Sequence, residues 1–251
     1  MASAAARLLF LAGFQVLVLE REQPLAVRRL VSFAQAVLDR TVEVGGVPGR
    51  QVEANDLPAA LAGGFVSVLV DPLGRSLARF QLEVLIDARM AKRNLGSARS
   101  DARLVVGLGP GFVAGVDVHA VVETQRGPNL GAVIWAGGAT ADTSVPGQVL
   151  GFREERVLRA PCAGRFRGLA KIGALVVAGD VVAEVEGAVV RAGVSGLVRG
   201  LLADGVSVDA RLKVGDIDPR GTTVDPAHIS DKARAVAAGV LEAVLVGLAR
   251  G

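Results

Sequence analysis

A glycine-rich turn is the first feature of this sequence that could bind a ligand. Gly107, Gly109 and Gly111 (GLGPGF) directly follow an apolar run that reads as a buried strand. Successive backbone N–H groups in such a turn can form a concave anion site, and open α/β sheets bind ligands at the carboxyl ends of their strands. A tight turn that requires positive φ would explain the same glycines without a ligand. Both interpretations stay open at this point.

Charged residues gather at the end of a second apolar run. Asp87 ends the run LEVLID, which places it at the rim of the predicted sheet, and Lys92, Arg93 and Asn94 follow closely. The two cations could bind an anionic ligand, or they could be ordinary solvated side chains. We include all four residues in the candidate ligand site.

Polar residues alternate along a third segment. Asp117, His119 and Glu123 share one face of the strand predicted over 116–123, because side chains alternate with a period of two. Such a row could hold a metal ion or a polar ligand, and the alternative is a solvated sheet face with a satisfied histidine. No metal-ligand set is predicted. Arg126 follows directly and could add a phosphate contact.

Several function classes are disfavoured by what the chain contains. The sequence has two histidines and one cysteine, which nearly excludes a structural zinc site within one chain and allows no intrachain disulfide. A net charge of +3 is spread over the chain without a basic run, so no nucleic-acid role is expected. The apolar runs at both ends are too short to span a bilayer. No nucleophile elbow, Walker lysine loop or HExxH motif occurs. We expect a cytoplasmic protein.

Apolar periodicity predicts an α/β unit over residues 1–140. A helix over 2–12 leads into a strand over 15–20, and Pro24 begins an amphipathic helix that runs to Leu38. A hairpin around Gly45-Gly46 and a short helix over 56–62 follow. Further strands are predicted over 65–71, 82–87, 102–108, 116–123 and 131–137. This alternation predicts an open, largely parallel, Rossmann-like sheet.

The order of the first elements is unusual for such a sheet. A doubly wound nucleotide-binding sheet begins with a strand and a glycine-rich turn before its first helix, and neither precedes this one. We therefore expect a Rossmann-like domain without its first strand, from a gene whose start lies upstream. With a turn of that kind just upstream, Glu20 would fall about twenty residues after it, where an acidic residue contacts a ribose.

A duplicated segment dominates the C-terminal part. Residues 159–185 and 191–217 align without a gap at an offset of 32, with ten of 27 positions identical. Copies this short cannot each bury a core, so they should fold into one another. The two halves resemble biotinyl/lipoyl barrel-sandwich domains, but the region where they meet, residues 184–190, has no lysine, which disfavours a swinging-arm carrier.

A boundary between the α/β and β parts is predicted where the chain becomes rich in glycine, threonine and proline, between about residues 137 and 153. The predicted domains are an α/β domain over 1–140, a β domain over 154–218, and a linker with a final helix over 219–251. Ser230 is the expected cap of that helix, which should pack on the α/β domain.

Several strings together resemble one protein family over almost the whole chain. They are Ala12–Phe14, Glu22–Arg29, Asp87–Asn94, Gly107–Phe112, Gly215–Gly221 and Ile229–Ala233. The sequence resembles the accessory proteins of the selenium-dependent molybdenum hydroxylase system. The resemblance implies an intracellular protein that works with hydroxylases of the xanthine-dehydrogenase type, in the maturation or insertion of their cofactor.

Three functions follow as alternatives. A maturation factor would bind a pterin dinucleotide or a similar anion at Gly107–Gly111, assisted by Lys92 and Arg93, and would dock on a molybdenum hydroxylase through its β domain. A nucleotide-dependent oxidoreductase would bind a nicotinamide nucleotide with Glu20 on the ribose. A non-enzymatic scaffold would bind the hydroxylase and no small molecule. The first is preferred, because the features at the sheet rim and the family resemblance agree.

Overall fold

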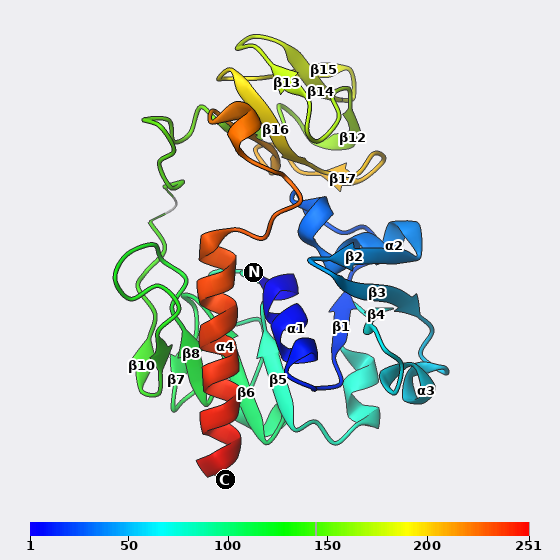
Figure 1. The fold of residues 1–251 in the computed structure, drawn as a ribbon, viewed down its shortest axis with the longest axis vertical. Coiled ribbons are helices and arrows are strands. Elements are labelled where there is room, and N and C mark those ends of the chain that lie inside the picture. The colour runs from blue at the N-terminus through cyan, green and yellow to red at the C-terminus, as the bar shows by residue number, and fades with distance from the viewer. Residues whose placement is uncertain (144, 251) are drawn as a thin grey trace.

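The computed structural model describes residues 1–143 and 145–250 and shows a mixed α/β molecule. Parallel-rich sheets form the N-terminal part, antiparallel sheets form the C-terminal part, and the last element is a long helix, α4 (Asp231–Arg250). Figure 1 shows the α/β part below and the β part above it. Each part has its own large hydrophobic core.

The strands of the α/β part form two four-stranded sheets, so the prediction of a single open sheet is wrong. The first sheet has the order β1-β4-β3-β2 and the second has the order β5-β6-β8-β9. Within them β1/β4, β3/β4, β5/β6 and β6/β8 are parallel, and β2/β3 and β8/β9 are antiparallel. The strands are β1 (Leu17–Glu20), β2 (Thr41–Val44), β3 (Val47–Val52), β4 (Val66–Val70), β5 (Val84–Asp87), β6 (Leu104–Leu108), β8 (Ala120–Val122) and β9 (Val133–Ile134).

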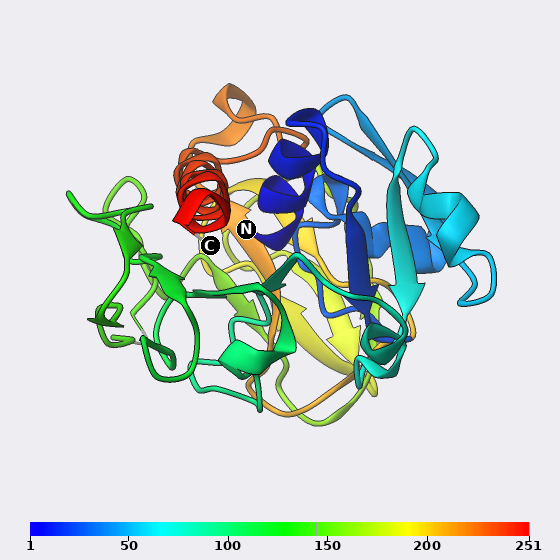
Figure 2. The same ribbon diagram turned by 90° about the horizontal axis from the view of Figure 1, so that it is seen from below.

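Two helices explain why the strands divide into two sheets. Helix α1 (Ala2–Leu11) and α4 lie side by side, as both views of the ribbon show (Figures 1 and 2). Ala5 of α1, Val68 of β4, Val106 of β6 and Val240 of α4 belong to one buried cluster. Because both sheets bury a face against this helix pair, one core serves two small sheets.

The amphipathic helix predicted from Pro24 to Leu38 is absent. Short 3₁₀ turns (Arg29–Val31 and Phe33–Gln35) and the brief helix α2 (Ala36–Asp39) occupy its place. The helical spacing misled because the apolar residues belong to different cores: Leu25 and Val27 pack on the β part, whereas Phe33 and Ala36 are buried in the α/β part. A segment that divides its apolar side chains between two cores cannot remain one helix.

Shorter elements complete the α/β part. The hairpin predicted around Gly45-Gly46 is confirmed as β2 and β3, and the short helix as α3 (Leu57–Leu61). A two-stranded ribbon joins β7 (Val113–Ala114) to β10 (Gly137–Gly138). Two further 3₁₀ turns span Arg75–Arg79 and Arg99–Asp101.

The duplicated segment forms two four-stranded antiparallel sheets of matching order, β15-β14-β12-β17 and β11-β18-β16-β13. Every strand in one sheet has its counterpart, 31 to 33 residues away, at the same place in the other. Each copy gives a short strand to the sheet of the other, since β17 pairs with β12 and β13 pairs with β16. The expectation that the copies fold into one another is met. The strands are β11 (Val157–Arg159), β12 (Gly164–Gly168), β13 (Leu175–Val176), β14 (Val181–Val185), β15 (Ala188–Arg191), β16 (Gly196–Leu201), β17 (Ser207–Val208) and β18 (Lys213–Asp218).

The chain returns to the α/β part after β18. A 3₁₀ turn (Gly221–Thr223) precedes α4, and Ser230 Oγ accepts a hydrogen bond from Ala233 N at 3.2 Å, as expected of a helix cap. Among the residues that the structure describes, no helix has the length and apolar character needed to cross a bilayer.

Candidate functional site

The candidate site lies at the rim of the second sheet. Strands β5, β6 and β8 are parallel, so their carboxyl ends meet at one edge. Asp87 at the end of β5 is in register with Gly107 in β6. The polar segments that follow the three strands are thereby brought together, although they are far apart in the sequence.

Asp87 organises the loop that follows β5. Its side chain is 3% exposed, and its carboxylate accepts hydrogen bonds from Arg89 Nη2 (2.5 Å) and Ser97 Oγ (2.7 Å). Burial opposes ionisation, but the hydrogen bonds from Arg89 and Ser97 outweigh it and lower the pKa of Asp87. Asn94 Oδ1 accepts from Gly96 N and Ser97 N in the same loop. The side chains of Asp87 and Asn94 therefore hold this loop in place and do not project from the rim.

The glycine-rich turn packs tightly on its neighbours. Gly109 and Gly111 have φ values of +76° and +106°, which favour glycine. A Cβ on Gly109 would lie 2.4 Å from Thr124 Oγ1, and one on Gly111 would lie 2.5 Å from Arg93 N. Gly107 is similarly covered by the Phe112 ring. The structure thus places the turn directly against the segment that carries Lys92 and Arg93, and close packing alone requires these glycines.

Basic side chains lie in the segments that follow β5 and β8. Lys92 Nζ lies 3.0 Å from Asp142 Oδ1, and Arg93 is exposed with no ion pair to the described residues. Arg126, after β8, donates two hydrogen bonds to Asp231 at the start of α4 (2.7 and 2.9 Å). These bonds hold the pKa of Asp231 well below its usual range.

Lys232 is a candidate site residue that the sequence argument missed. It is half-buried in the first turn of α4, and burial, followed by the charges of Arg126 and Lys92, lowers its pKa. A lysine whose charge is disfavoured by burial and by like charges is typical of a ligand site, where an anion would relieve the repulsion. The sequence does place Lys232 at the start of the final helix, in the string Ile229–Ala233. It does not show that this end of the helix lies near Arg126 and Lys92 in the fold.

The polar row predicted over 116–123 does not form an open site. Strand β8 begins only at Ala120. His119 Nδ1 accepts from Val105 N (2.9 Å), Asp117 accepts from Val113 N (2.9 Å), and Glu123, 3% exposed, accepts from Gln125 N and Thr140 N. Each side chain accepts hydrogen bonds from different backbone donors, which lie in β6 for His119, at Val113 for Asp117, and at Gln125 and Thr140 for Glu123, so a shared polar face is wrong. No group of three histidine, cysteine, aspartate or glutamate side chains in the described part of the chain is placed to hold a metal ion.

Glu20 lies apart from the rim residues, at the end of β1 in the other sheet. Its carboxylate accepts from Arg21 N (2.8 Å), and burial raises its pKa. The neighbouring strand β4 leads to Asp71, whose carboxylate accepts from Arg75 N and Ser76 N beside a hollow of about 180 Å³. The structure therefore does not bring Glu20 together with Gly107–Gly111.

A comparison of sequences finds a relative that is longer than this chain. The chain is 45% identical over all of its 251 residues to YqeB, an uncharacterised protein of Escherichia coli K12. The chain spans 46% of the length of that relative. No family model matches the sequence.

Solved structures add little. An aspartoacylase family protein from Mesorhizobium loti is 16% identical, with 34% of this chain and 27% of that chain covered, at a TM-score of 0.24. The product-bound ectoine utilization protein EutE (DoeB) from Ruegeria pomeroyi is 14% identical, with 80% and 84% covered, at a TM-score of 0.28. TM-scores this low establish neither a shared fold nor a shared activity.

Proposed function

We propose that this chain is an accessory factor in the maturation of selenium-dependent molybdenum hydroxylases, and that it binds an anionic, nucleotide-bearing ligand such as a pterin dinucleotide. One observation carries the proposal: strings that resemble the family converge in space. Asp87–Asn94 packs against Gly107–Phe112, and Ile229–Ala233 brings Asp231 and Lys232 to Arg126 and Lys92.

The chemistry of the rim supports an anion. Lys92, Arg93, Arg126 and Lys232 carry positive charge around the carboxyl ends of parallel strands. Open α/β sheets bind nucleotides at such edges. In this proposal Gly107–Gly111 positions Arg93 and approaches the ligand with its backbone, Lys92 and Lys232 contact the phosphates, and Asp87 and Asn94 hold the loop.

A finer description of the architecture belongs to the same proposal. We take the α/β part as one domain, over 1–140, and the duplicated part as a barrel-sandwich domain, over 154–218. The matching strand orders of the two antiparallel sheets support the second assignment. The hairpin tip of the β domain, Glu186-Gly187, offers no lysine for a carrier group. We therefore assign the β domain a docking role on the hydroxylase instead of a carrier role.

The experiment compares hydroxylase maturation in host cells that express wild-type protein, the Lys92→Gln/Arg93→Gln variant, or no protein. We expect the double variant to restore far less hydroxylase-bound cofactor than the wild type, at equal protein level. Variant Arg75→Gln/Arg79→Gln, in the 3₁₀ turn that follows β4 of the other sheet, is the matched control. Equal cofactor loading in all strains would overturn the proposal.

Two other functions are distinguished by the ligand that is found. A nicotinamide nucleotide bound near Glu20 would favour the oxidoreductase, which needs Glu20 on a ribose. A protein that binds the hydroxylase and no small molecule would favour a scaffold. The basic rim favours the maturation factor over both.

A further inference from the structure

The α/β and β parts meet where residues 23–29 cross β16. A Cβ on Gly200 would lie 2.6 Å from Val27 O, so the two backbones approach as closely as glycine permits. Arg29 Nε donates to Leu201 O (3.0 Å), and Gln23 Oε1 accepts from Ser207 N (3.0 Å). The junction is therefore an ordered contact between the two cores.

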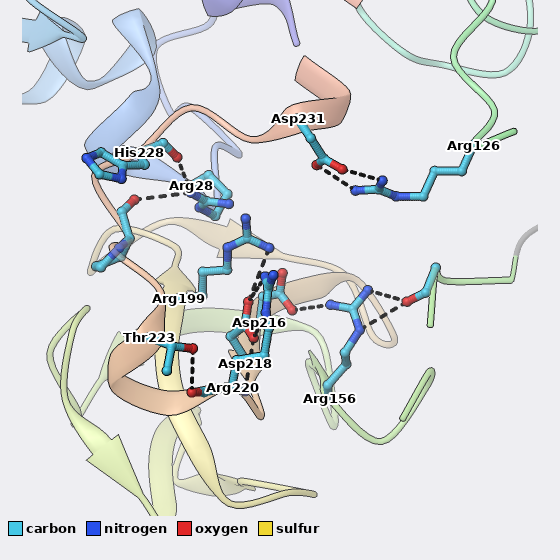
Figure 3. A network of polar contacts seen from close by, with 12 residues as sticks. Arg28, Arg126, Arg156, Arg199, Asp216, Asp218, Arg220, Thr223, His228 and Asp231 are labelled. Carbon is cyan, nitrogen blue, oxygen red and sulfur yellow. Dashed lines mark hydrogen bonds and ion pairs between the residues drawn. The ribbon is translucent and has the colours of Figure 1, made fainter. Parts of the chain in front are cut away.

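Two arginines from opposite sides of this contact lie together (Figure 3). Arg28, from the α/β part, donates Nη2 to the carbonyl oxygens of Pro226 and His228 (3.1 Å each). Arg199, from β16, has a side chain that is 15% exposed, with Nη1 3.4 Å from Asp218 Oδ2. The Nε atoms of both arginines are buried and have no hydrogen-bond partner among the described residues. A buried N–H without an acceptor is costly, which points to an acceptor that the chain does not supply.

The local backbone directs Arg199 to this place. The register between β16 and β18 shifts between Val198 and Gly200, so Arg199 is the extra residue of a β-bulge. Its counterpart in the first copy, Arg167, lies in unbroken register with Glu184, and its side chain is 67% exposed. Bulges re-aim side chains and occur next to functional sites. The equivalent strand pair of the first copy, β12 and β14, has no register shift.

Positive charge exceeds negative charge around the pair. Figure 3 shows Arg28, Arg126, Arg156, Arg199 and Arg220 with three carboxylates, Asp216, Asp218 and Asp231. Asp218 forms ion pairs with both Arg199 and Arg220. Asp216 forms an ion pair with Arg156, with 2.6 Å between Arg156 Nη1 and Asp216 Oδ1. Burial, followed by the charge of Arg199, lowers the pKa of Arg28 to about 10, so Arg28 stays charged at neutral pH although the nearby Arg199 disfavours that charge.

We propose that this junction is an anion site in which Arg28 and Arg199 hold one phosphate-bearing group, of the class of inorganic pyrophosphate or the diphosphate of a dinucleotide. Guanidinium groups bind phosphate oxygens through paired N–H donors, which would satisfy both free Nε atoms. The site goes beyond the proposed function, because it needs an anion but neither a hydroxylase nor the turn at Gly107–Gly111. It makes the β part a direct contributor to ligand binding.

Calorimetric titration with inorganic pyrophosphate at low salt tests the proposal. We expect saturable binding by the wild type and about tenfold or greater weakening in Arg199→Gln, the loss of a charge-assisted hydrogen bond. Arg167→Gln removes the equivalent arginine of the first copy and should bind as the wild type does. If pyrophosphate also binds at the rim, Arg93→Gln removes only that binding event and keeps the one that Arg199→Gln weakens, so failure at the rim and failure at the junction give different results.

Three results would overturn the proposal: no saturable binding, equal weakening in Arg167→Gln and Arg199→Gln, or a loss confined to Arg93→Gln. Thermal unfolding without pyrophosphate checks that Arg199→Gln is folded. If it is not, Arg199→Lys replaces it, since lysine keeps the charge but lacks the planar pair of donors. Weakened binding by Arg199→Lys would support the guanidinium contact, and unchanged binding would contradict it.

Discussion

The two copies of the duplicated segment have the same fold but different surroundings. Leu169 and Leu201 occupy equivalent positions, yet Leu169 is 46% exposed and Leu201 is 2% exposed. The second copy is covered by residues 23–29, whereas the same region of the first copy lines an open hollow of about 540 Å³ with Arg167 and Glu184. The second copy therefore forms part of the interface with the α/β part, and the first copy shows the same fold without such a contact.

The largest expected difference is in the cost of truncating the two leucines. Leu201→Ala should destabilise the protein by about 3 kcal/mol, because it opens a cavity in a buried site, and Leu169→Ala by less than about 1 kcal/mol. Urea unfolding at neutral pH measures both. Equal costs would show that the junction contributes no packing to the second copy.

A smaller contrast is expected for the paired glycines. Gly200→Ala should cost about 2 kcal/mol, since its Cβ would meet Val27 O at 2.6 Å. At Gly168 the nearest atom outside the adjoining residues is Asp204 Oδ1 at 3.3 Å, and Gly168→Ala should cost less than about 1 kcal/mol. Urea unfolding of the two variants under one condition gives the comparison, and a Gly200→Ala variant as stable as the wild type would mean that the two parts separate easily.

The sequence could predict the repeat but not this difference between its copies. Leucine stands at both 169 and 201, and arginine at both 167 and 199, so residue type alone cannot show which copy is covered. The hairpin at Gly45-Gly46 was predictable because its turn and strands are adjacent in the chain. The helix over 24–38 was not, because its apolar residues go to two cores. Lys232 and Arg199 were missed as site residues because only the tertiary fold brings them to other cations.

The acid dependence of stability should also distinguish the copies. Burial opposes ionisation of Asp218, but hydrogen bonds from Arg220 outweigh it and lower its pKa, so its contribution is present above its unfolded pKa of about 4 and is lost as pH falls further. Asp218→Asn should therefore be less stable than the wild type at pH 6, by about 1–2 kcal/mol, and the gap should narrow towards pH 3.

Urea midpoints across that pH range measure this gap. Glu186→Gln, at the equivalent position in the first copy, is the comparison. Glutamine keeps the oxygen that accepts from Arg165 N (2.9 Å), so Glu186→Gln should cost less than Asp218→Asn at pH 6. A gap between Asp218→Asn and wild type that stays constant from pH 6 to pH 3 would mean that ionisation of Asp218 does not stabilise the fold.

The smallest expected effect concerns ion pairs on the first copy. Arg167→Gln should change stability by less than about 0.5 kcal/mol, because its partner Glu184 is partly exposed and solvent screens the pair. Thermal unfolding of the free protein checks this value. A larger loss would remove Arg167→Gln as the matched control for Arg199.

Native mass spectrometry of the protein purified gently from its own host tests the central claim most directly, which is that the chain binds a nucleotide-bearing anion. The account predicts a retained mass that corresponds to a pterin dinucleotide, and loss of that mass in Lys92→Gln/Arg93→Gln but not in Arg75→Gln/Arg79→Gln. A chain that carries no nucleotide, and that takes up none when a pterin dinucleotide is added, would contradict the claim.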